Sequence, residues 1–356
     1  MMSDQENQAN ANSPKSNGAG PLMEVIGLKK YFPIKRGFFK RVVGHVKAVD
    51  NINFYVNEGE TLGLVGESGC GKTTTGRCVL RAIEPTSGQV LYRDPELGLV
   101  DIAQAEEEQF KTIHRHVRMI FQDPYASLNP RMTLQEIVGA PLRAMGISSG
   151  KELEDRVADM LQMVGLRPEY MRRYPHAFSG GQRQRIGLAR SLAPFPSFVV
   201  CDEPVSALDV SVQAQILNLL KELQERLGLT YLFVAHDLSV VAHISDRVAV
   251  MYVGKIVELA DTAELFINPK HPYTEALMSA IPLPDPRPRK KRILLSGEVA
   301  NPADPPSGCY FHPRCEYVKD ICSQEEPSFE EVAPDHYVKC HRAKELSLVG
   351  AYTSVV

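Results

Sequence analysis

Residues 66–73 have the types and spacing of a phosphate-binding loop. They read Gly-Glu-Ser-Gly-Cys-Gly-Lys-Thr and follow an apolar run at 61–65. Glycines here let the backbone curl, so that successive N–H groups converge on a phosphate at the positive end of the next helix. The lysine adds a positive charge, and the threonine hydroxyl is a ligand for Mg²⁺. The predicted nucleoside triphosphate site comprises Gly66, Glu67, Ser68, Gly69, Cys70, Gly71, Lys72, Thr73 and Thr74.

A second apolar run ends in two carboxylates. Residues 198–203 read Phe-Val-Val-Cys-Asp-Glu, the pattern of a buried parallel strand with acidic groups at its carboxyl edge. We expect Asp202 to hold Mg²⁺ together with Thr73, directly or through water. We expect Glu203 to be the catalytic base that orients the attacking water. Taken alone, these residues also fit a strand that ends in a solvated turn, but a phosphate-binding loop requires such an acidic partner.

A Ser-Gly-Gly-Gln run lies between these two elements. Ser179, Gly180, Gly181 and Gln182 offer a hydroxyl group and backbone amides at the start of a helix that we expect to continue to Leu192, which makes a second anion site. With this run the chain resembles the ATP-binding cassette (ABC) ATPases. In that family the run closes over the γ-phosphate of ATP bound to a second subunit. The resemblance therefore implies a head-to-tail dimer with two nucleotides at its interface.

Further positions match the family's motifs in chain order. Gln122 matches the loop glutamine that reaches the metal and the attacking water, and His236 matches the switch histidine at the γ-phosphate. The resemblance makes both catalytic residues and makes Gln122 a ligand of Mg²⁺. Residues 206–209 match the loop that crosses to the other subunit. Phe32 matches the aromatic residue that stacks on adenine, and Tyr31 is the alternative.

The resemblance also implies the fold and its domains. The fold class is α/β, an ABC-type P-loop ATPase core with an antiparallel β subdomain and a helical subdomain, plus a cysteine-containing C-terminal extension. We expect residues 23–281 to form the nucleotide-binding domain, with the helical subdomain at about 123–192. Residues 1–22, rich in Asn, Gln, Ser and Gly, are expected to be a disordered tail. Residues 282–356 are the expected extension.

Composition limits the location and the partners of the chain. Apolar residues make up 44% of the sequence and the formal net charge is −3, so the chain has enough apolar material for a core and no basic excess for nucleic acid. No run approaches the length of about eighteen apolar residues that a membrane span needs, and the N-terminus lacks an apolar secretory segment. We expect a peripheral protein on the cytoplasmic face of the cell membrane, with no nucleic-acid partner.

Residues 271–298 narrow the choice within the superfamily. His271-Pro-Tyr-Thr, the proline-rich run at 281–286 and Gly297-Glu298 resemble the tail of ATPase subunits from dipeptide and oligopeptide importers. The insertion at 38–45 fits the same group. This resemblance implies as partners a second ABC ATPase, commonly a different chain, two transmembrane permease subunits and an extracytoplasmic peptide-binding protein. It also places the groove for a permease coupling helix at residues 115–119, together with a turn at 124–130.

Two other functions remain as alternatives. Closely similar ATPases serve importers of nickel or other small solutes. A soluble ABC-type switch, for example in DNA repair or translation, usually needs a second cassette or a long coiled-coil insertion. Neither fits in 356 residues with one phosphate-binding loop, which disfavours that class.

Four of the seven cysteines cluster toward the end of the chain, at Cys309, Cys315, Cys322 and Cys340. Their segment is rich in Pro and Gly and has little apolar material to hold it together. Disulfides are disfavoured in a reducing cytosol, which leaves a metal site. Gaps of five, six and seventeen residues differ from the close pairs of structural zinc sites and favour an iron–sulfur cluster.

Alternatives to the cluster remain open. Zn²⁺ bound with the help of His312, His336 or His341 would also suit this segment, and so would unligated thiols. Some of the importer ATPases that the tail resembles carry a [4Fe–4S] cluster there, which favours the cluster. We expect changes at these cysteines to spare ATP binding, because they lie far along the chain from the last strand of the nucleotide site.

Overall fold

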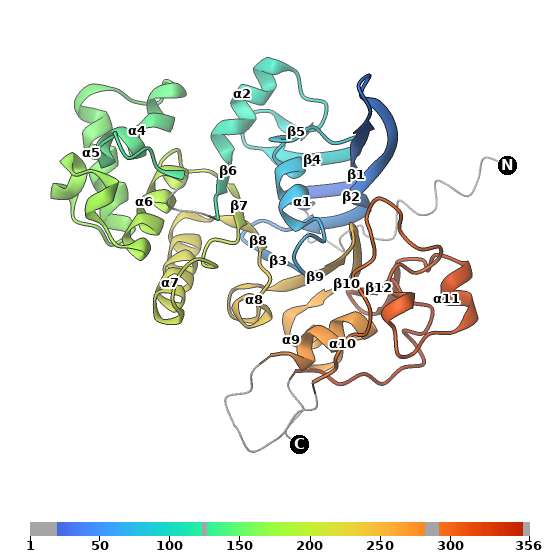
Figure 1. Ribbon diagram of the computed structural model, residues 1–356. Coiled ribbons are helices and arrows are strands. Elements are labelled where there is room, and N and C mark those ends of the chain that lie inside the picture. Colours follow the sequence, from blue (N-terminus) through green and yellow to red (C-terminus); the bar gives the residue numbers. More distant parts are fainter. Residues whose placement is uncertain (1–19, 123–126, 282–291, 352–356) are drawn as a thin grey trace.

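The computed structural model describes residues 20–122, 127–281 and 292–351 (Figure 1). The predicted disordered tail at 1–22 lies outside this range except for residues 20–22, of which Leu22 is buried. The turn expected at 124–130 is described only from residue 127 onward.

An eight-stranded sheet crosses the centre of the molecule in the order β11-β12-β10-β9-β3-β8-β7-β6. Strand β3 is parallel to β8 and β9, and β7 is parallel to β6 and β8, whereas the strands from β9 to β11 pair antiparallel. The strands are β3 (Thr61–Val65), β6 (Val117–Ile120), β7 (Phe198–Asp202), β8 (Thr230–Val234), β9 (Arg247–Tyr252), β10 (Lys255–Asp261), β11 (Glu330–Ala333) and β12 (His336–Val338).

Both faces of the central strands are buried, as their continuous apolar sequences predict. Along β7, Val199 and Cys201 belong to one hydrophobic core, while Phe198 and Val200 belong to the other. This alternation follows from the two-residue period of a strand. The sheet is thus covered on both faces, and the parallel strands end at one of its edges. Asp202 is the last residue of β7 at that edge.

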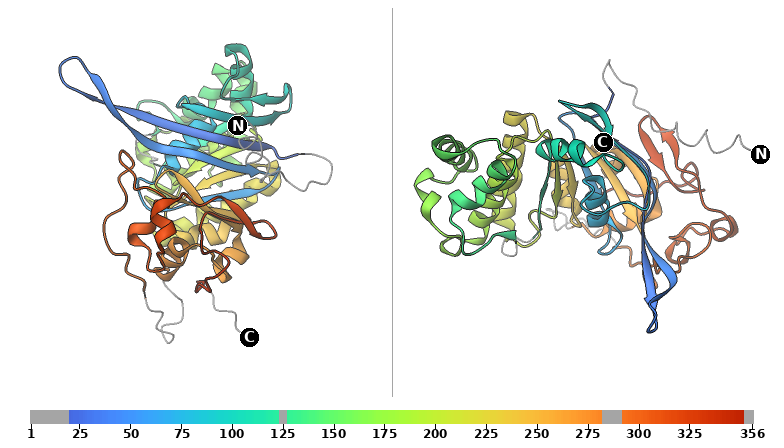
Figure 2. Two further views of the ribbon diagram at one scale, coloured as in Figure 1. Left: turned by 90° about the vertical axis from the view of Figure 1, so that its right-hand side faces the viewer. Right: turned by 90° about the horizontal axis from the view of Figure 1, so that it is seen from above.

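A second sheet of four antiparallel strands has the order β2-β1-β4-β5. It consists of β1 (Met23–Arg36), β2 (Arg41–Val56), β4 (Ser87–Asp94) and β5 (Gly98–Asp101). Helix α1 (Lys72–Val79) lies between the two sheets, because it contacts β1 and β2 on one side and β7 and β8 on the other. The predicted insertion at 38–45 forms the protruding end of the β1–β2 hairpin (Figure 2).

Three helices form a lobe on the left of Figure 1, namely α4 (Leu134–Ala144), α5 (Gly150–Met163) and α6 (Gly180–Leu192). The third confirms the helix expected to run from Ser179 to Leu192, and all three lie within residues 123–192, where a helical subdomain was expected. Capping boxes explain two of their starts, since Thr133 and Ser179 each exchange hydrogen bonds with the residue three positions later. Short 3₁₀ turns at Pro168–Arg172 and Pro175–Ala177 join α5 to α6.

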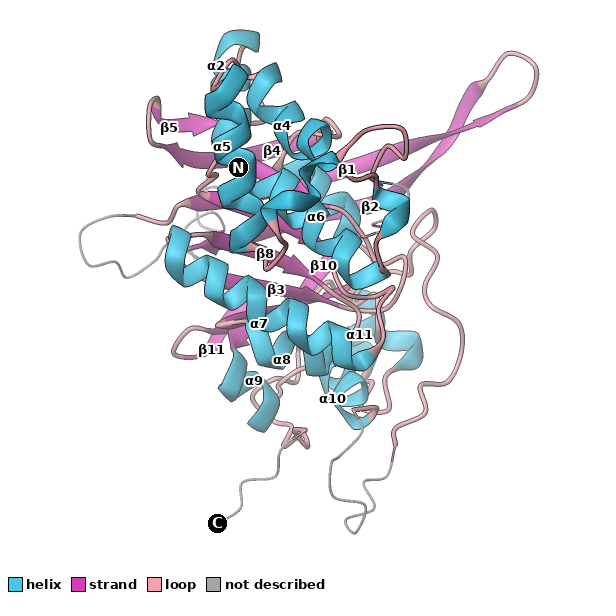
Figure 3. Ribbon diagram, turned by 90° about the vertical axis from the view of Figure 1, so that its left-hand side faces the viewer, coloured by secondary structure: helices cyan, strands magenta, loops and turns pink. Residues whose placement is uncertain are grey.

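The remaining helices cover the central sheet or extend its edges. Figure 3 shows α7 and α8 in front of the strands, on the face opposite α1. Helix α2 was not anticipated by the sequence analysis. The bounds are α2 (Glu107–His116), α7 (Val210–Leu227), α8 (Leu238–Ile244), α9 (Thr262–Ile267), α10 (Pro272–Ser279) and α11 (Asp320–Gln324).

The predicted C-terminal extension shares a sheet with the predicted nucleotide-binding domain. Strand β12 pairs with β10 through the partners Glu258–Val338 and Leu259–Tyr337, and β11 pairs with β12. These strands cover the backbone groups of β10 that would otherwise form an open edge. The tail, orange to red in Figure 1, therefore packs against the core.

Candidate functional site

Residues 66–71 curl tightly against two strands, and the space left explains two of their glycines. A Cβ atom at Gly66 would lie 2.1 Å from the carbonyl oxygen of Met251 in β9. At Gly71 it would lie 2.1 Å from the carbonyl oxygen of Ala48 in β2. Gly71 also has φ +111°, a conformation that side chains disfavour. The loop can take this shape only with glycine at both positions.

Lys72 begins helix α1 and is buried beneath the loop. Its Nζ donates to the carbonyl oxygens of Gly66, at 2.8 Å, and Glu67, at 3.0 Å. No side chain caps the N-terminus of α1. The first N–H groups of the helix are therefore available for an anion, and the lysine adds positive charge at the same point.

The two predicted Mg²⁺ ligands on α1 and β7 are in contact. The hydroxyl group of Thr73 donates to Oδ1 of Asp202 at 2.8 Å. Asp202 is 2% exposed, and burial raises the pKa of its carboxyl group. Arg77 lies 4.0 Å from the other oxygen. The chemistry of this pair, a carboxylate and a hydroxyl oxygen beside the loop, suits a hard divalent cation.

The three predicted catalytic side chains meet at one carboxylate oxygen. Nε2 of Gln122 donates to Oε2 of Glu203 at 2.9 Å, and Nδ1 of His236 lies 3.1 Å from the same oxygen. Glu203 has φ +46°, which is rare for a residue other than glycine. Such strained conformations gather at functional sites. The arrangement holds one carboxylate between two polar side chains from other elements.

Asp202 lines a neighbouring cavity, whereas the loop and the three predicted catalytic side chains line a cavity of about 480 Å³. It joins the phosphate-binding loop to the acidic edge of the sheet. Its lining consists of Ala48, Ser68, Gly69, Gly71, Lys72, Thr73, Thr74, Gln122, Glu203 and His236. Ala48 was not anticipated, since nothing in its type or spacing marks it.

Other predicted nucleotide ligands lie away from this cavity. Ser179 caps α6, where its hydroxyl group accepts from the N–H of Gln182 at 3.4 Å, and neither it nor residues 180–182 line the cavity. Phe32 lies on β1, is 37% exposed and has the ammonium of Lys30 at 5.0 Å from its ring centre. Tyr31 points elsewhere, because its hydroxyl group donates to Asp50.

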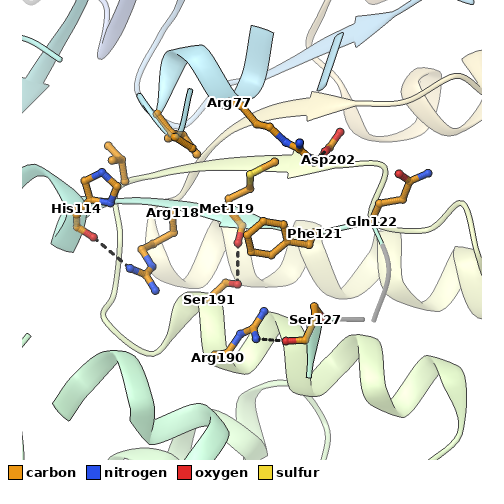
Figure 4. A pocket seen from close by; sticks show the side chains of 13 residues that line it. Arg77, His114, Arg118, Met119, Phe121, Gln122, Ser127, Arg190, Ser191 and Asp202 are labelled. Carbon is orange, nitrogen blue, oxygen red and sulfur yellow. Dashed lines mark hydrogen bonds and ion pairs between the residues drawn. The ribbon is translucent and has the colours of Figure 1, made fainter. Parts of the chain in front are cut away.

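A second cavity, of about 730 Å³, lies between α1, β6 and α6 (Figure 4). Arg77, Arg118 and Arg190 give it positive charge, and burial lowers the pKa of the last two. Phe121 lines it and is 46% exposed. Because Gln122 lines both this cavity and the nucleotide cavity, the two adjoin.

The four clustered cysteines line one small cavity in the tail, together with His312 and His341. All four are free thiols, and burial raises the pKa of Cys309, Cys315 and Cys340 to about 11. Within the described ranges, no group of three or more His, Cys, Asp or Glu side chains is arranged to hold a metal ion.

One alternative zinc ligand is used elsewhere. His336 is fully buried away from the cysteines, and its Nε2 lies 2.7 Å from Oε1 of Glu258. The same carboxylate accepts from the backbone N–H groups of Lys270 and His271, at 2.6 and 3.0 Å. His336 thus joins β12 to the start of α10 and serves the packing of the tail.

Comparisons with known proteins agree with this geometry. Residues 49–206 match the ABC transporter family, and residues 257–322 match the oligopeptide/dipeptide transporter C-terminal region. The chain is 52% identical over 322 residues to the oligopeptide transport ATP-binding protein AppF of Bacillus subtilis, covering 90% of this chain and 97% of that protein. It is 49% identical to a putative peptide import ATP-binding protein of Brucella ovis, covering 90% of this chain and 98% of that one.

A solved structure supports the same assignment. A dimeric ATP-binding cassette in a post-hydrolysis state, bound to ADP and Pi, matches with a TM-score of 0.58 and 28% identity over 67% of this chain and 98% of that chain. The ABC ATPase fold inferred from the motifs is thereby confirmed, and with it the need for ATP and Mg²⁺. The chain belongs to the ABC transporter ATPases, in the group that carries the oligopeptide/dipeptide transporter C-terminal region.

Proposed function

We propose that this protein hydrolyses ATP to power the import of oligopeptides or dipeptides through a membrane transporter. The observation that carries the proposal is the contact of Gln122 and His236 with Glu203 beside the phosphate-binding loop, in a chain whose tail matches the peptide-transporter region. The peptide substrate is supported by relatives that are named for oligopeptide transport and peptide import. These are 52% and 49% identical to this chain over 90% of its length.

The residues around the cavity divide the chemical work. Lys72 and the amides at the start of α1 bind the phosphates, while Thr73, Asp202 and Gln122 would hold Mg²⁺. Bound Mg²⁺ supplies charge neutralisation at the β- and γ-phosphates. Glu203 accepts a proton from the attacking water and orients that water toward the γ-phosphate. His236 and Gln122 hold that carboxylate in place from two sides.

The signature run at Ser179–Gln182 completes the site of a second ATPase subunit. Ser179 is exposed and residues 180–182 are half-buried at the N-terminus of α6, and none of them lines the cavity of its own chain, so this helix start can face another nucleotide. The solved cassette that matches this chain is a dimer, which supports the same arrangement. We propose that the second ATPase is a different chain, and that Phe32 stacks on adenine.

The cavity between α1, β6 and α6 is the proposed docking site of a permease. A short helix of the permease would find apolar contact at Phe121 and positive charge from Arg118 and Arg190 (Figure 4). Those charges complement the negative end of a helix or an acidic side chain. Because Gln122 lines this cavity and also contacts Glu203, movement of the docked helix has a direct route to the catalytic carboxylate.

No helix in the described part of the chain is long and apolar enough to cross a membrane. We propose that the protein is peripheral and acts at the cytoplasmic face, held there by two permease subunits. An extracytoplasmic binding protein would deliver the peptide. The relatives' roles in transport and import support this partnership.

We further propose that the four clustered cysteines bind a [4Fe–4S] cluster. Their thiols line one buried cavity, and thiolates are the usual ligands of such clusters. A single Zn²⁺ needs its sulfurs within about 2.3 Å of one point, whereas a cluster separates them more widely. The cavity that the four thiols share is the observation that supports this proposal.

Reconstitution tests the transport proposal. The chain is assembled in proteoliposomes with the two permease subunits and the second ATPase. ATP hydrolysis is then measured with peptide-loaded binding protein outside the vesicles. We expect peptide-dependent ATPase activity and uptake, both lost with Lys72→Ala because ATP binding is lost. Stimulation by nickel and not by peptide would support the small-solute alternative. Activity that needs no membrane partner would support the soluble switch.

A further inference from the structure

The cysteine segment contacts the phosphate-binding loop through one ion pair. Nη1 and Nη2 of Arg314 donate to the two carboxylate oxygens of Glu67, at 2.8 and 3.2 Å. Arg314 directly precedes Cys315, and Glu67 is the second residue of the loop. Residues separated by 247 positions in the chain thus form a two-point contact. Such a paired geometry is stronger and more directional than a single charged hydrogen bond.

The pair is well placed to matter because it is largely removed from water. The side chain of Arg314 is 7% exposed and that of Glu67 is 29% exposed. Hydrogen bonding to Glu67 is the main cause that raises the pKa of Arg314. Ion pairs on open surfaces contribute little, but a pair shielded in this way is costly to break, since one charge is then left buried and unpaired.

Glu67 is held at every polar group that it has. Its N–H donates to the hydroxyl group of Tyr273 at 2.9 Å, and its carbonyl oxygen accepts from Lys72 at 3.0 Å. Only its carboxylate reaches the tail. An unneutralised carboxylate in a loop that binds a triphosphate would repel the ligand and would be free to swing toward it. Arg314 removes both problems.

Aromatic packing fixes the position of Arg314 from the tail side. Phe311, 2% exposed, packs at right angles on Tyr252 with ring centres 5.3 Å apart, and it lies 5.4 Å from Tyr273. The guanidinium of Arg314 lies 6.0 Å from the ring centre of Tyr252. Residues 311–315 form one turn, since Arg314 N–H donates to the carbonyl oxygen of Phe311. The turn also carries three of the residues that line the cysteine cavity, Phe311, His312 and Cys315.

We propose that Arg314 is a positioning residue for ATP binding, and that it makes the affinity of the phosphate-binding loop depend on the folded state of the cysteine segment. This inference rests on the proposed function, because it assumes that the loop binds ATP. It leads to the opposite of the expectation that changes at the clustered cysteines spare ATP binding. That expectation used distance along the chain, whereas the tail returns to the loop in space.

The test measures equilibrium binding of Mg-ATP to the full chain and to variants of Arg314 and Glu67. We expect Arg314→Ala to raise the Kd by roughly tenfold, in line with the loss of a charge-assisted pair. Arg314→Lys should recover part of the affinity, because it keeps the charge and loses the paired geometry. In a Glu67→Gln chain there is no charge to neutralise, so adding Arg314→Ala should change the Kd by less than about threefold.

Arg342→Ala is the matched control. Arg342 also lies in the tail, lines the cysteine cavity and pairs with a glutamate, Glu345 at 3.1 Å, but it does not touch the loop. Thermal unfolding is measured alongside. If Arg314→Ala leaves the Kd unchanged, if it weakens the Glu67→Gln chain equally, or if Arg342→Ala weakens ATP binding as much without lowering the unfolding temperature, the positioning role is refuted.

ATP binding by the parent chain distinguishes failure of the proposed function from failure of the proposed role of Arg314. If it binds ATP and Lys72→Ala does not, the nucleotide site stands whatever Arg314 does. If the parent chain itself fails to bind ATP, the proposed function fails and the role of Arg314 fails with it.

Discussion

Replacing Glu203 by glutamine should separate ATP hydrolysis from ATP binding. The change keeps the size of the side chain and removes its charge. A glutamine oxygen can still accept from Nε2 of Gln122, which now lies 2.9 Å from the carboxylate, so the local packing has no reason to collapse. The phosphate-binding loop and Lys72 are untouched. What is lost is a group that accepts a proton from water.

The structure indicates the size of the effect. General-base catalysis by a positioned side chain contributes about 10²- to 10⁴-fold. Glu203 is held by two partners on one oxygen, Gln122 at 2.9 Å and His236 at 3.1 Å, which leaves the other oxygen for water. We therefore expect hydrolysis to fall by at least about a hundredfold, which is about 2.7 kcal/mol in the barrier.

Two measurements on the same preparation test this. Phosphate release is followed in the assembled transporter under saturating ATP, and Mg-ATP affinity is measured by equilibrium binding. Glu203→Gln should bind ATP as the parent does and release phosphate at no more than about one hundredth of its rate. Turnover within a few-fold of the parent would refute Glu203 as the base. Equal loss of binding and turnover would show that the change disturbed the loop instead.

Three further outcomes are expected. Ser179→Arg should leave Mg-ATP binding to this chain intact and abolish hydrolysis at the site that it completes on the second subunit; surviving activity in the assembled complex would mean that this composite site is degenerate or wrongly assigned. Gly66→Ala should lower the free energy of unfolding by roughly 1–3 kcal/mol and weaken ATP binding, since its Cβ meets the Met251 carbonyl oxygen, and an unchanged melting curve would contradict this. Protein purified without oxygen should contain about four irons and four acid-labile sulfides and absorb near 400 nm, with Cys315→Ser losing the iron and Cys78→Ala keeping it; stoichiometric zinc without iron would favour the zinc alternative.

Local signals in the chain were sufficient for the nucleotide site because each motif carries its own structural cause. A five-residue apolar run, a glycine-rich turn and a helix start are contiguous, so the loop at 66–73 forms from neighbours in the sequence. The helix at Gly180–Leu192 was predictable for the same reason, since Ser179 and Gln182 cap it across three residues. Glu203 and Asp202 followed from the strand that they end.

Contacts between distant segments were not predictable in the same way. Helix α2 begins within an acidic run and buries one apolar residue, Ile113, so it offers few apolar positions from which to recognise a helix. The sequence indicated only an insertion at 38–45, whereas the structure shows the end of a hairpin between β1 and β2. The pairing of these two strands depends on their register across the turn, which the sequence does not record. Nothing near Arg314 in the sequence marks Glu67 as its partner.

By itself, the sequence determined that this chain has a phosphate-binding loop, an acidic strand end and a signature helix, because each depends on residues within about one turn or one strand of each other. The tertiary structure alone decided that Gln122 and His236 both contact one carboxylate oxygen of Glu203. It also decided that the tail joins the central sheet and contacts the phosphate-binding loop through Arg314. Such contacts arise when strand order and packing bring remote segments together, and no local pattern records which segments those are.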